Sequence, residues 1–153
     1  MKRLIMVVMM MLAMTASCYA ASWEWVGSND KYGIFYDTDS LIFEMSSKTQ
    51  TVNRDRVVVW EKMIYDEAFV QKRFDLKNIK YSITQVTFDF ATNKLYEEKV
   101  VYYDKDGGFL RQEPGERKWI GIIPDTVGDA IKKHVEKYAR AHTEEIEQRT
   151  RGN

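Results

Sequence analysis

The sequence predicts a single α+β domain over residues 21–153, built from an antiparallel sheet of about six strands with a C-terminal α-helix packed on one face. Three observations indicate this class. Short runs of β-branched and aromatic residues alternate with turn-forming residues through most of the chain. One long amphipathic pattern occupies residues 127–148. Hydrophobic residues make up 44% of the 153-residue chain, which is enough apolar material for one core.

Residues 1–20 have the pattern of a secretory signal peptide. Lys2-Arg3 gives a positive start, an uncharged apolar run follows, and small residues lead to Ala20. The apolar run is too short for a comfortable membrane span and has no stop-transfer flank. We therefore expect cleavage between Ala20 and Ala21, no membrane span in the mature protein, and export to the periplasm or the cell surface.

Cys18 leaves a second processing route open. The stretch Thr15-Ala16-Ser17-Cys18 loosely fits a bacterial lipobox, in which the cysteine is lipidated and becomes the first residue. Thr15 and the bulky Tyr19 depart from the usual lipobox pattern, so we prefer simple cleavage after Ala20. Cys18 is the only cysteine of the chain, so we expect a mature domain without disulfides that is stabilised by packing.

The strand at residues 56–65 is the expected centre of the sheet. Three consecutive valines lead into Trp60, and both faces of this half are apolar, so we expect the strand to be covered on both sides. Tryptophans in such strand patterns are more often core residues than anchors of a binding surface. This interpretation applies to Trp23, Trp25, Trp60 and Trp119.

Shorter elements surround this central strand. The strands before it are expected at residues 23–26, 31–37 and 41–45, with turn residues between them. After it, residues 66–78 predict a short helix. Asp66 can cap that helix, apolar residues recur within it at helical spacing, and Asn78 can end it.

Three strands joined by turns follow the short helix. They are expected at residues 81–90, 95–104 and 109–112. One face of the first strand carries Ser82, Thr84, Val86, Phe88 and Phe90. Residues 105–108 predict a hairpin turn, because glycine adopts positive φ at little cost. The acidic start of this turn resembles a calcium loop, but no third acidic ligand follows and Gly115 stands where that loop needs a glutamate.

The C-terminal helix has the clearest local signature. An apolar extended segment at residues 119–124 precedes it, and Thr126 with Asp129 three residues later forms an Asp variant of the capping box. The side expected to face the sheet repeats at helical spacing as Val127, Ile131, Val135 and Tyr138. We expect one continuous helix to residue 148, with polar last turns that fray.

No motif indicates catalysis, a metal or a cofactor. His134 and His142 lie eight residues apart on the predicted helix and have no further ligand at a usable spacing. The chain has no Gly-x-Ser-x-Gly context, no phosphate-cradling glycine loop and no dinucleotide fingerprint. We therefore expect a protein that is not an enzyme. A hydrolase whose site is assembled only by the fold is the remaining catalytic alternative.

The charge distribution argues against a nucleic-acid partner. Removing Lys2 and Arg3 with the leader leaves 21 basic against 23 acidic residues, so no global field favours polyanions or anionic membranes. The densest basic cluster is interleaved with aromatic residues and is a candidate surface for an acidic protein or glycan partner, with an ordinary solvated face as the alternative. This cluster consists of Lys72, Arg73, Lys77 and Lys80.

A set of spaced residues also carries a family resemblance. They are Trp25, Tyr32, Tyr36-Asp37 and Ser40 near the start, Val58-Val59-Trp60 with Lys62 in the central strand, Tyr102-Tyr103-Asp104 before a glycine turn, and Trp119-Ile120, Ile123-Pro124, Thr126, Ala130-Ile131, Val135 and Tyr138 near the end. In this order, after a signal peptide, the mature chain resembles the surface-adhesin protein E family of secreted bacterial proteins.

The resemblance implies a small antiparallel sheet with a C-terminal helix across it. It also implies a non-enzymatic protein of the envelope or cell surface that forms a dimer and binds host matrix and serum proteins such as laminin and vitronectin. An exposed sheet edge or uncovered face would favour a homodimer on physical grounds as well. The alternative is a periplasmic domain with a structural or small-ligand-binding role.

Overall fold

The computed structural model of the protein describes residues 21–73 and 78–152. The predicted cleavage after Ala20 and the alternative lipidation at Cys18 lie outside these residues. The strands are β1 (Trp23–Ser28), β2 (Tyr32–Asp37), β3 (Ile42–Met45), β4 (Val52–Tyr65), β5 (Tyr81–Asp89), β6 (Lys94–Tyr103), β7 (Phe109–Pro114) and β8 (Ile120–Gly121). The helices are the 3-10 turn η1 (Thr38–Ser40), α2 (Glu67–Arg73), α3 (Val127–Ala141) and α4 (Thr143–Gly152).

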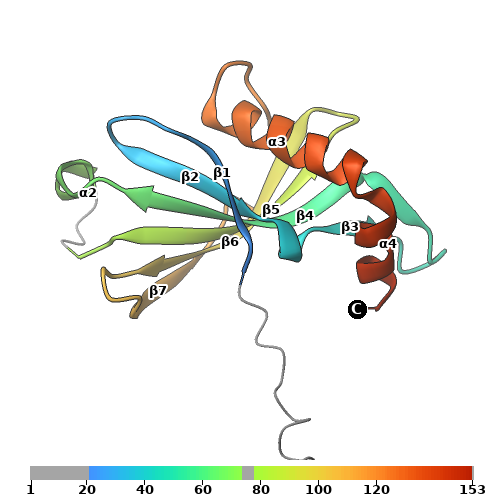
Figure 1. The fold of residues 1–153 in the computed structure, drawn as a ribbon, viewed down its shortest axis with the longest axis horizontal. Coiled ribbons are helices and arrows are strands. Elements are labelled where there is room, and N and C mark those ends of the chain that lie inside the picture. Colours follow the sequence, from blue (N-terminus) through green and yellow to red (C-terminus); the bar gives the residue numbers. More distant parts are fainter. Residues whose placement is uncertain (1–20, 74–77, 153) are drawn as a thin grey trace, which may run out of the picture.

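Within the described residues, the strands form one antiparallel eight-stranded sheet. Six strands follow the order β1-β2-β4-β5-β6-β7, β3 pairs with β4, and the short β8 pairs with β6. Figure 1 shows α3 and α4 over one side of this sheet and α2 at its far end. The α+β class, the antiparallel sheet and the C-terminal helical cover are therefore confirmed.

The long strand β4 is the centre of the sheet, as its valine-rich sequence predicts. It pairs with β5 on one side, and with β2 and β3 along different halves of the other side. Val57 and Val59 point to the helix-covered side and are fully buried, whereas Val58 and Trp60 remain partly exposed on the opposite side. The expectation that both faces of this strand are covered is wrong, because the helices cover only one.

The main core lies between the sheet and the two C-terminal helices. Phe88 on β5 lies in register with Val57 on β4, and both side chains are 0% exposed. Val86 and Phe90 flank Phe88 on the same face, which the alternating pattern of this strand predicts. From the helices, the buried residues of this core are Ile131, Val135, Ala139 and Ile146.

The C-terminal helical segment consists of two helices rather than the one continuous helix predicted. The helical path breaks at His142, whose backbone has φ −118° and ψ 30°. Next to the break, the Thr143 hydroxyl donates to the carbonyl oxygens of Ala139 and Arg140, a local bond that competes with regular helix geometry. After the break α4 packs against β3, and Ile146 becomes fully buried.

The end of α4 is anchored to the sheet, so the expectation that its last turns fray is also wrong. The backbone N–H of Phe43 donates to Thr150 Oγ1 over 2.9 Å, and that hydroxyl donates to the carbonyl of Ile146 over 2.7 Å. Arg149 donates to the carbonyl oxygens of Thr38 and Leu41. These bonds satisfy buried backbone groups that a frayed helix would leave without partners.

The start of α3 is at the predicted residue, but its contacts differ from a capping box. Thr126 occupies the N-cap position without a side-chain cap bond, and its hydroxyl donates to the carbonyl of Ile123. Asp129 instead accepts from the backbone N–H of Asp125 and from Lys133 Nζ. The carboxylate therefore holds the preceding loop and one helix lysine rather than the N-cap backbone.

The short helix α2 covers the other end of the same sheet face. Asp66 caps it as predicted, since Asp66 Oδ1 accepts from the backbone N–H groups of Ala68 and Phe69. Val70 on α2 is 1% exposed and belongs to a second apolar cluster with Tyr65, Ile79 and Tyr102.

Candidate functional site

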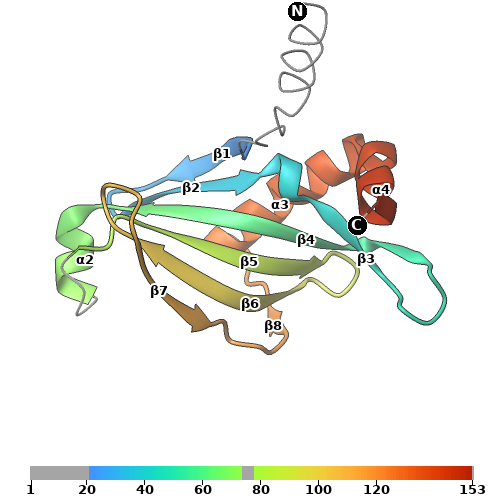
Figure 2. The same cartoon turned by 90° about the horizontal axis from the view of Figure 1, so that it is seen from below.

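The sheet face opposite α3 and α4 is the candidate binding surface, and we call it the open face. Figure 2 shows α3 passing behind the strands, so that the open face is turned toward the reader. Strand register places alternate residues on this face in cross-strand rows. One row is Trp60, Gln85 and Lys99, and the next is Lys62, Ile83 and Val101.

Aromatic side chains dominate the open face. Trp25 is 50% exposed, Phe109 is 65% exposed and Trp119 is 39% exposed. Each of these rings contacts a neighbouring ring, namely Phe35, Tyr103 and Tyr96 respectively. The rings therefore form a supported aromatic surface instead of isolated apolar side chains.

The expectation that the tryptophans are core residues is wrong. Trp23 and Trp60 are partly exposed, and the other two are more exposed still. Strand pairing places Trp23, Trp25 and Trp60 on the side of the sheet opposite the helices. The Trp119 ring lies against Tyr96 and Arg56 on that same side. A strand apolar on both faces cannot reveal from its sequence which face a helix will cover.

Cations lie over several of these rings. Lys62 Nζ is 4.6 Å from the ring centroid of Tyr81 and 5.3 Å from that of Trp23. Lys99 Nζ is 5.0 Å from the ring centroid of Trp60. These distances are within the range in which the electron-rich ring face attracts a cation.

A third cation of the open face, Arg56, is neutralised within the chain. Its guanidinium lies 5.0 Å from the Trp119 ring and also donates to Glu44 and to Asp89, each over 2.9 Å. The pKa of Arg56 is raised, chiefly by the hydrogen bond to Glu44. Burial raises the pKa of Asp89, but hydrogen bonds from Thr92 and Arg56 outweigh it, so the net pKa is lowered.

Lys62 and Lys99 differ from Arg56 in this respect. Among residues 21–73 and 78–152, no ion pair joins either lysine to a carboxylate. Aromatic rings lie against both positive charges. The sequence signal for this arrangement was the alternation of Trp60 with Lys62, which places both side chains on one face of β4.

A pair of carboxylates lies on the opposite, helix-covered side of the sheet. Glu61 is in register with Tyr36 on one side and Thr84 on the other. Burial, with a smaller contribution from the nearby charge of Glu97, raises the pKa of Glu61 to about 8. Burial also raises the pKa of Glu97, and this outweighs the backbone hydrogen bond from Glu116, which lowers it.

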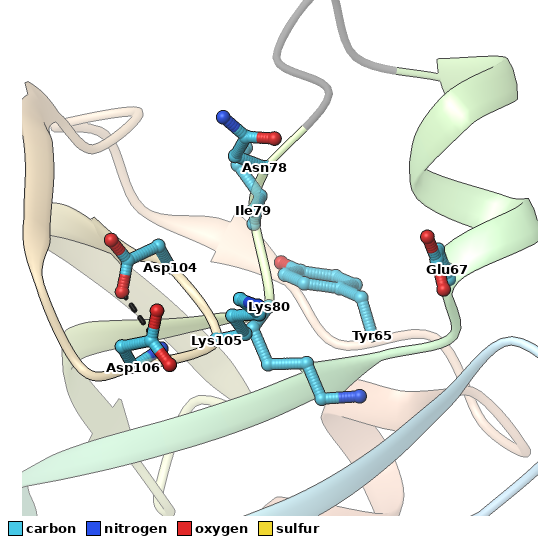
Figure 3. A pocket seen from close by; sticks show the side chains of 8 residues that line it. All are labelled: Tyr65, Glu67, Asn78, Ile79, Lys80, Asp104, Lys105 and Asp106. Carbon is cyan, nitrogen blue, oxygen red and sulfur yellow. Dashed lines mark hydrogen bonds between the residues drawn. The ribbon is translucent and has the colours of Figure 1, made fainter.

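A pocket of about 490 Å³ lies beside α2 and is the best-formed cavity around the predicted basic cluster. Figure 3 shows its lining side chains, with Glu67 from α2, Lys80 from the segment before β5, and the acidic turn after β6. The lining consists of Tyr65, Glu67, Asn78, Ile79, Lys80, Asp104, Lys105 and Asp106. Its charges are of both signs, so it does not select a ligand of one charge.

The predicted basic cluster lies at α2 and at the segment before β5. Lys72 is exposed on α2, and Lys80 is exposed at the rim of the pocket. Arg73 ends α2, and Lys77 lies outside the described residues.

The remaining candidates from the sequence behave as surface or turn residues. His134 is exposed, and the exposed His142 stacks on Tyr138 with ring centroids 4.0 Å apart. No group of three His, Cys, Asp or Glu side chains within the described ranges could hold a metal ion. The acidic turn before β7 is a hairpin turn, in which Asp104 Oδ1 accepts from the backbone N–H groups of Asp106 and Gly108.

Comparison with known proteins gives no family assignment. No protein-family model, no curated protein sequence and no solved structure matches this chain. The resemblance to the surface-adhesin protein E family therefore depends on the sequence features alone. In the part of the chain that the structure describes, no helix is long and apolar enough to cross a lipid bilayer.

Proposed function

We propose that this protein is an exported binding protein of the bacterial envelope or cell surface, without catalytic activity, whose open face contacts a host or envelope protein. The observation that carries the proposal is the exposure of Trp25, Phe109 and Trp119 on one uncovered sheet face. Tryptophan, tyrosine and arginine are the residues most enriched among those that dominate protein–protein binding energy. Exposed aromatic groups of this size on a soluble domain mark interaction surfaces.

The rigidity of the open face supports the same proposal. Its side chains project from a hydrogen-bonded sheet whose other side is a packed core, with Trp25 on the edge strand β1 and Phe109 on the edge strand β7. The side chains of this surface would lose little conformational freedom on binding, because ring contacts such as that of Trp25 with Phe35 already restrict them. A preorganised aromatic surface is therefore suited to a protein partner.

The secretory pattern of residues 1–20 and the resemblance to surface-adhesin protein E support the proposed location and partners. The family implies binding to host matrix and serum proteins, so laminin and vitronectin are the first partners to test. Both the periplasm and the cell surface agree with an exported domain. The open face would be available to a host protein only at the cell surface.

We expect immobilised laminin or vitronectin to retain the mature protein, and the double variant Trp25→Ala/Phe109→Ala to bind about tenfold or more weakly. Both side chains are exposed, so their removal takes away contact area without opening the core. Surface plasmon resonance measures the loss, and circular dichroism verifies the fold. His134→Ala, on the exposed surface of α3, is the matched control and should bind like the wild type.

Two results would count against this proposal. Absence of retention of the wild-type protein at low salt would remove the adhesin function. Retention that survives Trp25→Ala/Phe109→Ala but is lost in His134→Ala would move the binding surface to the helical side.

A second candidate function is a periplasmic domain that binds a small ligand, and the pocket beside α2 favours it. The pocket's mixed lining of Lys80, Lys105 and acidic side chains suits a small polar or zwitterionic molecule. Cell fractionation discriminates between the two functions. A protein found only in the soluble periplasm, protected from external protease on intact cells, would favour the pocket over the adhesin role.

A further inference from the structure

The centre of the open face has two positive charges without acidic partners. Lys62 on β4 and Lys99 on β6 each contact aromatic rings, and no carboxylate within the described residues forms an ion pair with them. Glu44 and Asp89 on this face are both bound to Arg56 near one end of the sheet, and Asp39 lines a hollow of the same face beside Val58 and Trp60. Within the described residues, the ion-paired charges of this face thus lie at its Arg56 end, whereas Lys62 and Lys99 have no ion-pair partner.

We infer that the open face binds an acidic segment of its protein partner, and that Lys62 and Lys99 each receive one carboxylate of that segment. This inference rests on the proposed function, which it extends by naming the chemistry of the partner. Each lysine would gain a carboxylate and keep its aromatic contacts, as Arg56 does with Asp89 and Trp119. The chain thus contains one completed example of the arrangement that we propose for the two lysines.

Strand geometry sets the spacing that the partner needs. Lys62 is in register with Ile83 and Val101, and Lys99 is two residues from Val101 along β6. Two inter-strand spacings and two residues of strand rise place the two lysine Cα atoms about 12 Å apart. Residues four apart in an extended chain lie on the same side and are separated by about 13 Å, so an extended acidic segment fits.

The aromatic surroundings make this recognition stronger than an ordinary surface ion pair. An exposed pair contributes little, because water and salt screen it. A partner that covers Trp60 and Tyr81 would exclude water around Lys99 and Lys62, which lowers the local dielectric and strengthens each lysine–carboxylate contact. The unpaired charges would also attract an acidic partner before contact, with a rate that falls as salt rises.

A second copy of this chain is a less suitable occupant of the open face. A two-fold contact centred on this face would bring the lysines of both copies together, and like charges in an interface are unfavourable. A homodimer would more easily use a sheet edge. The acidic segment is thus the occupant that the charge distribution favours.

Fluorescence anisotropy with a labelled peptide of six Glu-Ser repeats tests the inference, with a peptide of six Gln-Ser repeats as the neutral probe. We expect the mature wild-type protein to bind the glutamate peptide at low salt and about tenfold or more tightly than the glutamine peptide. Lys62→Gln/Lys99→Gln should lose about tenfold in affinity, and Lys62→Arg/Lys99→Arg should keep it because arginine preserves the charge and the ring contact. Lys72→Gln/Lys80→Gln removes the same number of charges elsewhere and should bind like the wild type.

The outcomes separate this inference from the proposed function. Equal binding of the two peptides by the wild-type protein would overturn the inference, as would loss of binding in Lys72→Gln/Lys80→Gln alone. If laminin or vitronectin retains the protein through Trp25 and Phe109 without any need for the open-face lysines, that result would preserve the proposed function and contradict the binding of an acidic segment. Lysine-dependent peptide binding without retention by either host protein would support the acidic segment and remove the adhesin role.

Discussion

Phe88→Ala is expected to lower the free energy of unfolding by about 3–5 kcal/mol. Phe88 is 0% exposed and is the largest side chain among the fully buried residues. It lies on β5 opposite Val57, beneath the helices, where the strands and α3 leave little freedom to close the cavity. Urea unfolding followed by circular dichroism measures the change.

Phe109→Ala is the matched control, because it removes the same side chain from the open face. Phe109 is 65% exposed and makes an edge-to-face contact with Tyr103, so we expect the free energy of unfolding to fall by no more than about 1 kcal/mol. If Phe88→Ala does not fold, Phe88→Leu should still lose about 1–2 kcal/mol. If Phe88→Ala and Phe109→Ala lower the free energy of unfolding equally, the helices do not cover the sheet face that we assign to the core.

Glu61→Gln is expected to stabilise the protein at pH 8 and to have little effect below about pH 4.5. In the folded state, burial and the smaller effect of the Glu97 charge together raise the pKa of Glu61 from 4.5 to about 8. Between these pH values the unfolded chain releases the proton while the folded chain keeps it, so the wild type loses stability as pH rises. Glutamine has no proton to release, so the stability of the Glu61→Gln variant does not fall with pH in this way.

The difference between the folded and unfolded pKa of Glu61 corresponds to a loss of about 5 kcal/mol in the free energy of unfolding as pH rises. We expect about half of that loss, because Glu61 keeps some contact with solvent. Urea unfolding at pH 4, 6 and 8 measures the difference between variant and wild type. Glu67→Gln, on the exposed surface of α2, is the control and should show no comparable gain. A pH-independent difference between Glu61→Gln and the wild type would contradict an uncharged Glu61 in the folded state.

The strands and the core side of β5 could be predicted from the sequence because their signals are local. Alternation in β5 identifies the face of Val86 and Phe88, and glycine in the turn before β7 identifies a hairpin, with Gly107 at φ +82°. The break at His142 has no such signal. It depends on the position of β3, onto which α4 turns to bury Ile146, and that contact joins distant parts of the chain.

The candidate binding surface was harder to predict than the fold. Val58 and Trp60 are as apolar as the buried Val57 and Val59, so composition alone could not show which face the helices would cover. The basic residues near α2 formed a denser run in the sequence than Lys62 and the distant Lys99. Only strand pairing brings those two lysines onto one aromatic face.

The most direct test of the central claim, an open aromatic face opposite a helix-covered core, is acrylamide quenching of tryptophan fluorescence in the folded protein. All 4 tryptophans of the sequence lie on the open face, and Trp25 is 50% exposed. An open face predicts red-shifted emission, strong quenching, and a clear loss of the quenchable signal in Trp25→Phe. Blue-shifted emission that acrylamide cannot quench would place the tryptophans in a core and contradict the open face.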